Sequence, residues 1–369
     1  MSDRYTRNSG RSSGQGRSPQ RPASDPYGGR TPDRSSVRRR SRRTSFKLTP
    51  SAIIPLAVLA LIVILGIVAV IRLVHWNKGT ASTYDPTVVN TAYDVEVLDV
   101  IIPIDPALLE GRTDDGTTTV LFLGDDPVCG DDETGLAGQI AKLGGNKTKT
   151  ISAGFPDSQI ASVNALFDTD YLDDAFNFYY VANAINMGDY TTMETVATIK
   201  NDIRFKNSVE TLKSVDFESV DIIAVMYDAS DYLHRSPVWN DNDDGDLQTY
   251  TGALKRGIEL IKEAYPHIRL VFLSPTYAFY PLEDGTYDDA NYTDLGNGAL
   301  PTYVIKAIDV TGNCGISFID NYFGSVNENN HSKYLADHVH LNEAGFRQVA
   351  RHFVSKILNN DKEEFDPGY

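Results

Sequence analysis

Cysteine is scarce in this sequence, with only Cys129 and Cys314 among 369 residues. Cys129 follows the carboxyl end of one predicted strand, whereas Cys314 precedes the amino end of another. In a parallel sheet these ends are about 17–20 Å apart, and bridged cysteines need Cα atoms within about 7 Å. The sequence therefore argues against a disulfide and predicts two free thiols.

Large apolar residues are nearly absent from residues 1–50, which are rich in Ser, Arg, Pro and Gly. Such a segment cannot bury a core, so we predict that it is disordered. It holds thirteen Lys or Arg residues against three Asp or Glu residues. This tail is therefore strongly basic.

Positive charge is scarce in residues 79–369, where nineteen Lys or Arg residues stand against forty-seven Asp or Glu residues. An acidic surface of this kind argues against nucleic acid as a partner, and against tight contact with anionic polymers away from a local basic patch. The opposite charges predict that the basic tail and the acidic part lie in two different cellular compartments.

Between these parts lies the long uncharged stretch 52–71. Twenty residues of helix span roughly 30 Å, the thickness of the hydrocarbon core of a bilayer. The stretch is longer than the apolar core of a cleavable signal peptide, about 7–15 residues. We therefore predict one membrane-spanning helix, residues 51–74, that contacts membrane lipid. The basic cluster at residues 38–47 places the N terminus in the cytoplasm by the positive-inside rule.

The predicted organisation follows from these boundaries. We expect a disordered basic cytoplasmic tail (1–50), the membrane helix (51–74), a stalk and edge segment (75–117), one extracytoplasmic domain (118–360) and a C-terminal tail (361–369). Within the domain, five apolar strands are predicted at residues 118–124, 149–154, 220–227, 267–275 and 316–320. Helical segments separate them, one of them predicted to begin near residue 157. This alternation predicts an α/β fold with a five-stranded parallel sheet covered by helices on both faces.

Four blocks of the domain carry a family resemblance. Residues 337–346, DHVHLNEAGF, place Asp337 three residues before His340 at the start of a last helix. This block resembles the last block of the SGNH (GDSL) hydrolases. Residues 121–126 (LFLGDD), 151–158 (ISAGFPDS) and 225–233 (VMYDASDYL) follow in the family's order. The resemblance implies a flavodoxin-like hydrolase fold and an activity on ester bonds, without a cofactor.

The resemblance also implies roles for individual residues. Asp337 and His340 correspond to the family's orienting acid and general base. Asp126 stands where the family has its nucleophilic serine. The backbone oxyanion donor corresponds to Asp157, or to Gly154 with a shift of the alignment. In the third block, Ser230 replaces an asparagine donor, Asp228 replaces the preceding glycine and Asp231 is retained.

These replacements matter chemically. Serine-type acyl transfer needs a hydroxyl activated by histidine and donors for the developing oxyanion. A carboxylate, with an ordinary pKa of about 4, is a weak nucleophile. Removing one oxyanion donor costs about 10² to 10³ in rate. An ordinary serine esterase is therefore not expected unless another hydroxyl, such as Ser158 or Ser230, takes part.

Three interpretations remain open. The first is a catalytically inactive domain that binds a cell-envelope polysaccharide, with Asp126 and His340 forming an ion pair across the old site. The second is an altered hydrolase, in which Asp126 or Asp337 acts with His340 to activate water against O-acyl groups. The third makes Asp125, Asp126 and His340 ligands of a hard cation, which their spacing alone does not support. The acidic run 240–245 resembles the start of a calcium loop but has Thr251 where that loop requires glutamate, so we interpret it as a solvated loop.

The predicted topology can be tested with protease added to intact cells. Residues 79–369 should be digested, because they lie outside the membrane, whereas the N-terminal tail should be protected. Epitope tags at the two ends, read by immunoblot, provide the measurement, and permeabilised cells provide the control. Protection of the C-terminal part in intact cells contradicts the predicted topology.

Overall fold

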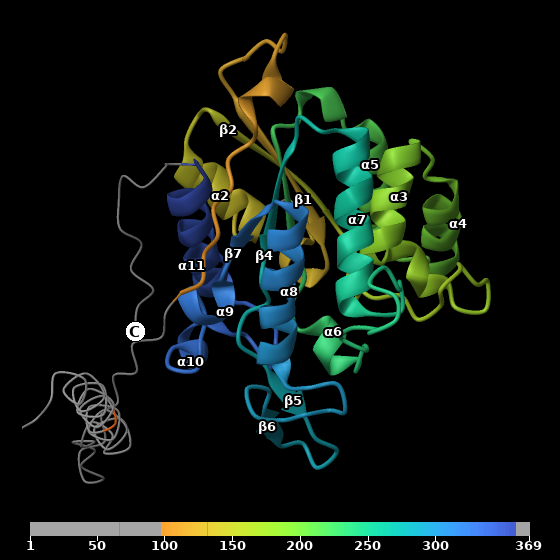
Figure 1. Cartoon of the computed structure of the whole chain (residues 1–369), viewed down its shortest axis with the longest axis vertical. Coiled ribbons are helices and arrows are strands. Elements are labelled where there is room, and N and C mark those ends of the chain that lie inside the picture. The colour runs from red at the N-terminus through yellow and green to blue at the C-terminus, as the bar shows by residue number, and fades with distance from the viewer. Residues whose placement is uncertain (1–65, 67–96, 131, 359–369) are drawn as a thin grey trace, which may run out of the picture. The chain divides into compact units, whose positions relative to one another are not determined.

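The computed structural model describes residues 97–130 and 132–358, together with Gly66 (Figure 1). The predicted tails 1–50 and 361–369 lie outside the described residues, as does the predicted membrane span apart from Gly66. Within the part that is described, no helix combines the length and the apolar character that a bilayer crossing requires. Contacts divide the chain between residues 89 and 90, and the fold described here is that of the unit 90–369.

The centre of this unit is a parallel sheet of five strands, as the sequence predicts. Its order is β2-β1-β3-β4-β7, and every neighbouring pair is parallel. The five predicted apolar segments form its strands: β1 (Thr118–Gly124), β2 (Thr148–Gly154), β3 (Ile222–Met226), β4 (Arg269–Leu273) and β7 (Ser317–Ile319).

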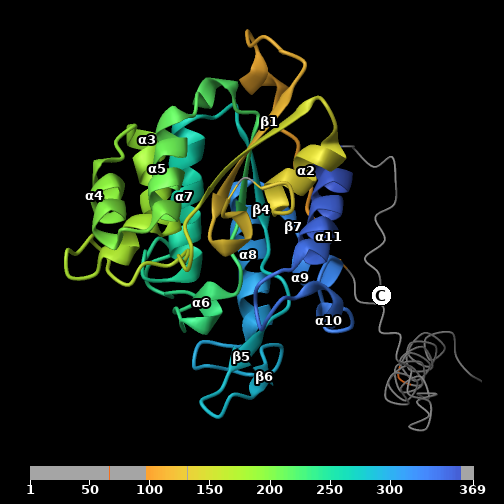
Figure 2. The ribbon, with the colours of Figure 1, turned by 180° about the vertical axis from the view of Figure 1, so that it is seen from behind.

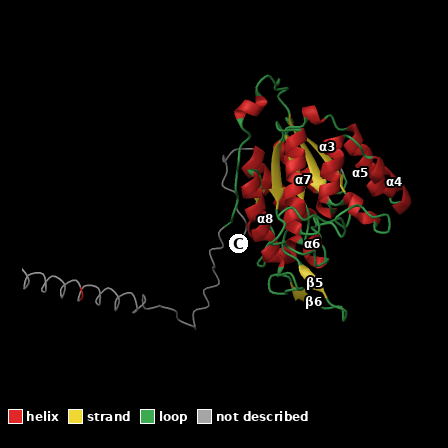
Figure 3. Cartoon of the chain, turned by 45° about the vertical axis from the view of Figure 1, so that its right-hand side comes forward, coloured by secondary structure: helices red, strands yellow, loops and turns green. Residues whose placement is uncertain are grey.

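Successive strand residues pack into two different cores. In β1, Leu121 and Leu123 face one core, whereas Val120 and Phe122 face the other. The first core is covered by α3, α5, α7 and α8, and the second by α2 and α11, which come forward in Figure 2. Helices therefore cover both faces of the sheet, which confirms the predicted α/β fold (Figure 3). The longer helices are α2 (Leu136–Gly144), α3 (Phe178–Met187), α4 (Thr191–Lys200), α5 (Ile203–Ser214), α7 (Tyr250–Ala264), α8 (Leu300–Cys314) and α11 (Glu343–Phe353).

Short elements lie mainly in the connections. Residues 278–297 contain an antiparallel hairpin at the lower end of the view in Figure 1. The hairpin strands are β5 (Phe279–Pro281) and β6 (Tyr287–Asp289), and the short α-helices are α6 (Ser230–Leu233), α9 (Asn321–Gly324) and α10 (His331–Tyr334). The 3-10 turns are Pro106–Leu109, Asp126–Val128, Leu172–Phe176 and Phe217–Ser219, and a π-helical turn, Val354–Leu358, follows α11.

Glycines fix the level at which the central strands end. In the pairing of β1 with its neighbours, Gly124 lies opposite Gly154 on one side and Met226 on the other. A Cβ atom at Gly124 would lie 1.7 Å from the carbonyl oxygen of Met226, and one at Gly154 would lie 2.6 Å from that of Val128. Gly124 also has a φ of 150°. Only glycine fits this close approach, which brings three strand ends and their loops together.

The predicted edge segment joins the sheet and the last helix. Val100 pairs antiparallel with Phe318 of β7 through two backbone hydrogen bonds, of 2.9 and 2.8 Å. Asp99 accepts a hydrogen bond from the backbone N–H of Asp320 at 2.9 Å and lies 2.8 Å from Nε2 of the fully buried His352. The segment that enters the domain is thus bound both to β7 and to α11.

The helix predicted to begin near residue 157 is absent, and residues 156–168 form turns and bends. Two buried carboxylates explain the difference. Asp231 accepts hydrogen bonds from the N–H groups of Ile160 and Ala161, and Asp174 accepts those of residues 163 and 164. These bonds take the donors that a helix would direct to its own carbonyl groups. Both cysteines are free, in agreement with the predicted separation of their strands.

Two helical glycines allow a matched test of the packing. A Cβ atom at Gly257 of α7 would lie 2.4 Å from the ring of Phe178 in α3, whereas one at Gly312 of α8 meets no atom within 4 Å. We expect Gly257→Ala to lower the free energy of unfolding by about 1–3 kcal/mol through overpacking. Gly312→Ala should raise it by up to about 1 kcal/mol, because alanine favours the helix. Urea unfolding followed by circular dichroism measures both, and equal effects of the two variants contradict the α3–α7 packing.

Candidate functional site

The polar residues singled out in the sequence gather where β1, β2 and β3 end. Within the sheet, β2 lies on one side of β1 and β3 lies on the other, so the strand order reverses at β1. Loops diverge at such a reversal, and α/β proteins bind ligands in the resulting crevice. Asp126 follows β1, Asp157 follows β2 and Asp228 follows β3, while His340 lies in the loop before α11.

Asp126 occupies the position expected for the nucleophile and contacts the expected oxyanion donor. Its Oδ2 accepts a hydrogen bond of 2.7 Å from the backbone N–H of Asp157. Asp157 has a φ of 59°, which explains why the family resemblance has glycine at this position. Of the two predicted donors, Asp157 makes this contact, whereas Gly154 packs beneath the carbonyl of Val128. A carboxylate therefore holds the N–H group that would otherwise face a substrate oxygen.

Asp337 orients His340. Its Oδ1 accepts the backbone N–H of His340 at 2.8 Å, and its Oδ2 lies 2.7 Å from Nδ1 of the ring. Partial burial lowers the pKa of His340, but the hydrogen bond and charge of Asp337 outweigh this effect, and the pKa lies above its ordinary value. Burial likewise opposes ionisation of Asp337, but the Val339 N–H and His340 lower its pKa to about 2. The pair is therefore an imidazole held by an ionised carboxylate.

The Ser230 hydroxyl lies between two buried carboxyl groups. Its Oγ is 2.6 Å from Oδ2 of Asp125 and 2.5 Å from Oδ1 of Asp228. One hydroxyl proton cannot serve two ionised carboxylates, so one of these carboxyl groups must carry a proton. Burial and the charge of Asp228 raise the pKa of Asp125 well above its ordinary value, which assigns the proton to Asp125. Burial raises the pKa of Asp228 as well.

This arrangement gives Asp125 and Ser230 supporting positions. Asp125 also accepts the backbone N–H of Asp228 at 2.9 Å and so joins the loops after β1 and β3. Because the Ser230 hydroxyl binds these two acids, it does not replace the missing asparagine as a donor to the cleft. Ser158, the other hydroxyl considered, is only 5% exposed.

Asp231 supports the loop that carries Asp157. Its two oxygens accept the N–H groups of Ile160 at 2.8 Å and Ala161 at 3.0 Å. Complete burial raises its pKa to about 6, although these hydrogen bonds act in the opposite direction. Its place in the site is therefore behind the loop rather than in the cleft.

Asp126, Asp228 and His340 converge on one point. A carboxylate oxygen of each aspartate and a ring nitrogen of the histidine lie within 4.8 Å of one another. Among the described residues this is the one such group of three or more potential ligands, and it contains Asp228 where the third interpretation had Asp125. The predicted contact between Asp126 and His340 is not a direct ion pair, since the described ion pairs within 4.0 Å include His340 with Asp337 but not with Asp126. Asp228 was not among the predicted site residues, although the acid in place of the expected glycine was a usable signal.

The rim of the site carries further aromatic and basic side chains. His234 Nε2 lies 3.8 Å from a carboxylate oxygen of Asp157, and Arg235 donates a hydrogen bond of 2.7 Å to the hydroxyl of Tyr280. His338 is partly buried and stacks on Tyr287, with ring centroids 5.7 Å apart. The β5–β6 hairpin thus borders the cleft next to His340.

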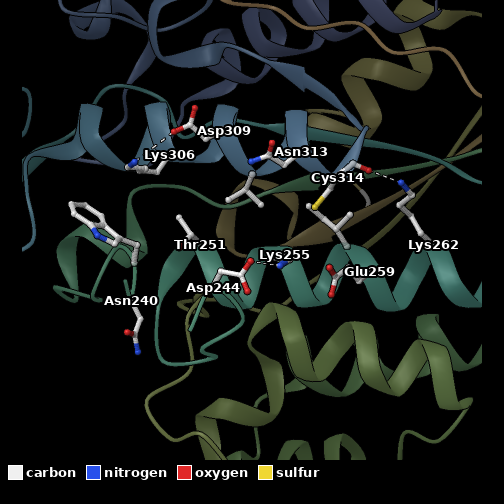
Figure 4. A pocket seen from close by; sticks show the side chains of 13 residues that line it. Asn240, Asp244, Thr251, Lys255, Glu259, Lys262, Lys306, Asp309, Asn313 and Cys314 are labelled. Carbon is white, nitrogen blue, oxygen red and sulfur yellow. Dashed lines mark hydrogen bonds and ion pairs between the residues drawn. The ribbon is translucent and has the colours of Figure 1, made fainter. Parts of the chain in front are cut away.

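Another hollow lies away from this cluster. A groove of about 790 Å³ runs between α7 and α8, with Trp239, Thr251, Glu259 and Asn313 among its lining residues (Figure 4). Two of its three lysines are paired with carboxylates, since Lys255 lies 2.6 Å from Asp244 and Lys306 lies 3.6 Å from Asp309. None of the predicted site residues lines this groove. The acidic run 240–245 lies at its border and forms no group of potential metal ligands within the described region.

Comparisons with known proteins gave structural likenesses alone. No family model matches the chain, and no curated protein matches it. Similar solved structures include a Lactobacillus plantarum protein (18% identity, TM-score 0.44, covering 66% of this chain and 98% of that one). They also include a carbohydrate acetylesterase from Sinorhizobium meliloti (12% identity, TM-score 0.42, covering 66% of this chain and 99% of that one). A third is an aryl esterase from M. smegmatis (13% identity, TM-score 0.40, covering 65% of this chain and 100% of that one). At these identities and scores, the functional conclusion rests on the geometry of the site itself.

The Asp337–His340 pair predicts a measurable titration. In metal-free buffer, ¹⁵N NMR of histidine-labelled protein should give His340 a pKa above the ordinary value of about 6.5. Asp337→Asn should lower this pKa, because the remaining burial disfavours the charged ring.

The same pair makes stability depend on pH. The contribution of His340 to the free energy of unfolding is complete below about pH 6.5 and is lost as pH rises through the raised pKa of its ring. The contribution of Asp337 is present above about pH 4 and is lost as pH falls toward 2.

Asp157→Asn provides the control for this titration. It removes an exposed carboxylate near the site that contacts His234 rather than His340. The pKa of His340 should stay nearly unchanged in this variant. An equal decrease in both variants contradicts a specific Asp337–His340 bond.

Proposed function

We propose that the domain is an SGNH-hydrolase-like module that has lost serine-type acyl transfer and binds a cell-envelope polysaccharide at the cleft around Asp126 and His340. One observation carries this proposal: Oδ2 of Asp126 accepts the Asp157 N–H at 2.7 Å. In acyl transfer such an N–H stabilises the oxyanion that develops on the substrate. Here an anionic side chain already binds it, and the same side chain replaces the nucleophile.

The second oxyanion donor is missing as well. The asparagine that the resemblance implies is Ser230, whose hydroxyl lies between Asp125 and Asp228. Losing one donor costs about 10² to 10³ in rate, so the loss of nucleophile and donor together leaves little serine-type activity. The supports of the cleft remain, namely Asp231 behind the Asp157 loop and Asp337 behind His340. This combination favours retained binding over retained turnover.

We further propose an extracytoplasmic location for this module. The support is the uncharged stretch 52–71, with the basic cluster before it and the acidic domain after it. In this arrangement the cleft faces the cell envelope, where polysaccharides are the abundant polymers. A neutral or weakly charged glycan fits the acidic surface better than nucleic acid does.

An altered hydrolase is the second candidate, and the intact His340–Asp337 pair favours it. An imidazole oriented in this way can accept a proton from water. The attacking group would then be water beside Asp126 or Asp337 rather than a protein hydroxyl. In that case hydrolysis of an O-acyl group depends on His340 in the unmodified protein.

Restoring the implied residues tests the proposal. The full-length chain in detergent is assayed with p-nitrophenyl acetate and an acetylated glycan. We expect the wild type and His340→Ala to have the same low rate. Asp126→Ser should create a weak activity, and Asp126→Ser with Ser230→Asn should increase it by a further factor of about 10² through the added oxyanion donor.

Two further variants complete this assay. Adding His340→Ala to the double variant should abolish the gain, because the serine then lacks its base. Asp126→Asn, which has the same size but no hydroxyl, should show no gain. Wild-type hydrolysis that is lost in His340→Ala contradicts the inactive module and supports the altered hydrolase.

A further inference from the structure

Three side chains from separate parts of the sequence point to a ligand that the hydrolase comparison does not include. Asp126 follows β1, Asp228 follows β3 and His340 precedes α11, yet their oxygen and nitrogen atoms lie within 4.8 Å of one another. They do not bond one another directly; their described hydrogen bonds go to other partners. Their free atoms are therefore placed around one point rather than against each other.

Each of the three side chains is held from behind by a different group. The Asp157 N–H binds Oδ2 of Asp126, which leaves Oδ1 for a ligand. The N–H and hydroxyl of Ser230 both bind Oδ1 of Asp228, at 2.8 and 2.5 Å. Such outer partners are typical of metal sites, where they fix the orientation of the ligands.

The histidine shows this arrangement most clearly. Asp337 is a carboxylate and can only accept, so the Nδ1 atom that lies 2.7 Å from it carries the proton. Nε2 is then the ring nitrogen left for a ligand. A histidine with a carboxylate behind it and a ring nitrogen within 4.8 Å of oxygens from two further carboxylates has the donor set of a metal centre.

The residue types add a second argument. At the two positions where the resemblance implies a serine and a glycine, this chain has Asp126 and Asp228. Both replacements place a carboxylate at the same point beside His340. Two carboxylates directed at one point repel each other, and either a protonated His340 or a divalent cation bound by the three side chains offsets that repulsion.

We propose that Asp126, Asp228 and His340 bind one divalent transition-metal ion. One imidazole nitrogen and two carboxylate oxygens suit zinc or manganese better than calcium, which prefers oxygen ligands alone. Ligand atoms about 2.1 Å from a metal lie about 3–4 Å apart, so the three side chains close slightly around the ion. Asp126 is half-buried and His340 is exposed, which leaves coordination positions open toward the cleft.

The inference concerns the same site as the proposed function but goes beyond it. Metal binding is measured without any substrate, so a failure of the esterase assay and a failure of metal binding are separate results. In the second candidate, the bound ion would lower the pKa of a water molecule in the cleft.

The test uses the full-length chain in detergent, treated with EDTA, dialysed and titrated with ZnCl₂ and MnCl₂ by calorimetry at pH 7. We expect one ion per chain. Asp228→Asn and His340→Gln should each weaken binding by at least about 100-fold, and Asp337→Asn, which changes an outer partner, by about 10- to 100-fold. Asp243→Asn, in the acidic run 240–245, should leave binding unchanged.

A second measurement guards against misfolding of the buried Asp228 variant. In ¹⁵N-histidine NMR, ZnCl₂ should shift the Nε2 signal of His340 in the wild type and in Asp243→Asn, and this shifted signal should be absent in His340→Gln. Absence of saturable binding up to about 1 mM of either metal overturns the proposal. Binding that persists in both His340→Gln and Asp228→Asn, or that shifts other histidines instead, also overturns it.

Discussion

The site depends on one steric constraint at the centre of the sheet. β1 lies between β2 and β3, and its last residue, Gly124, leaves no room for a Cβ atom beside the carbonyl of Met226. The three strands therefore end at one level and release their loops at the same edge. Asp126, Asp157 and Asp228 are neighbours for this reason, although a hundred residues separate the first from the last.

Crowding of negative charge at this edge is balanced in three ways. Burial raises the pKa of Asp125 and so favours its neutral form, which shares the Ser230 hydroxyl with Asp228. A backbone N–H group binds Asp126, and an imidazole faces the remaining carboxylates. In a hydrolase such N–H and imidazole groups serve a substrate anion, whereas here they lie against the protein's own carboxylates. The chemistry of the cleft is consequently that of a cation site more than of an oxyanion site.

The sequence predicted the features that depend on local patterns. Apolar runs located all five strands, and the three-residue spacing of Asp337 and His340 is the spacing at which the structure bonds them. It failed where distant contacts decide the outcome. The predicted helix near residue 157 is lost to the buried carboxylate of Asp231, seventy residues away. Asp228 enters the site through the pairing of β1 with β3, and its local sequence indicated this only by an acid in place of the expected glycine.

The contacts of Asp99 have a mechanical consequence. Asp99 and Val100 bind the chain near residue 100 to α11 and to β7, close to where the described residues begin. Tension applied ahead of residue 97 is therefore taken up first by the last helix and the outermost strand. β1 and β3 lie further inside the sheet and carry Asp126 and Asp228. A force on the N-terminal side would have to break the contacts of Asp99 and Val100 before it could distort the cleft.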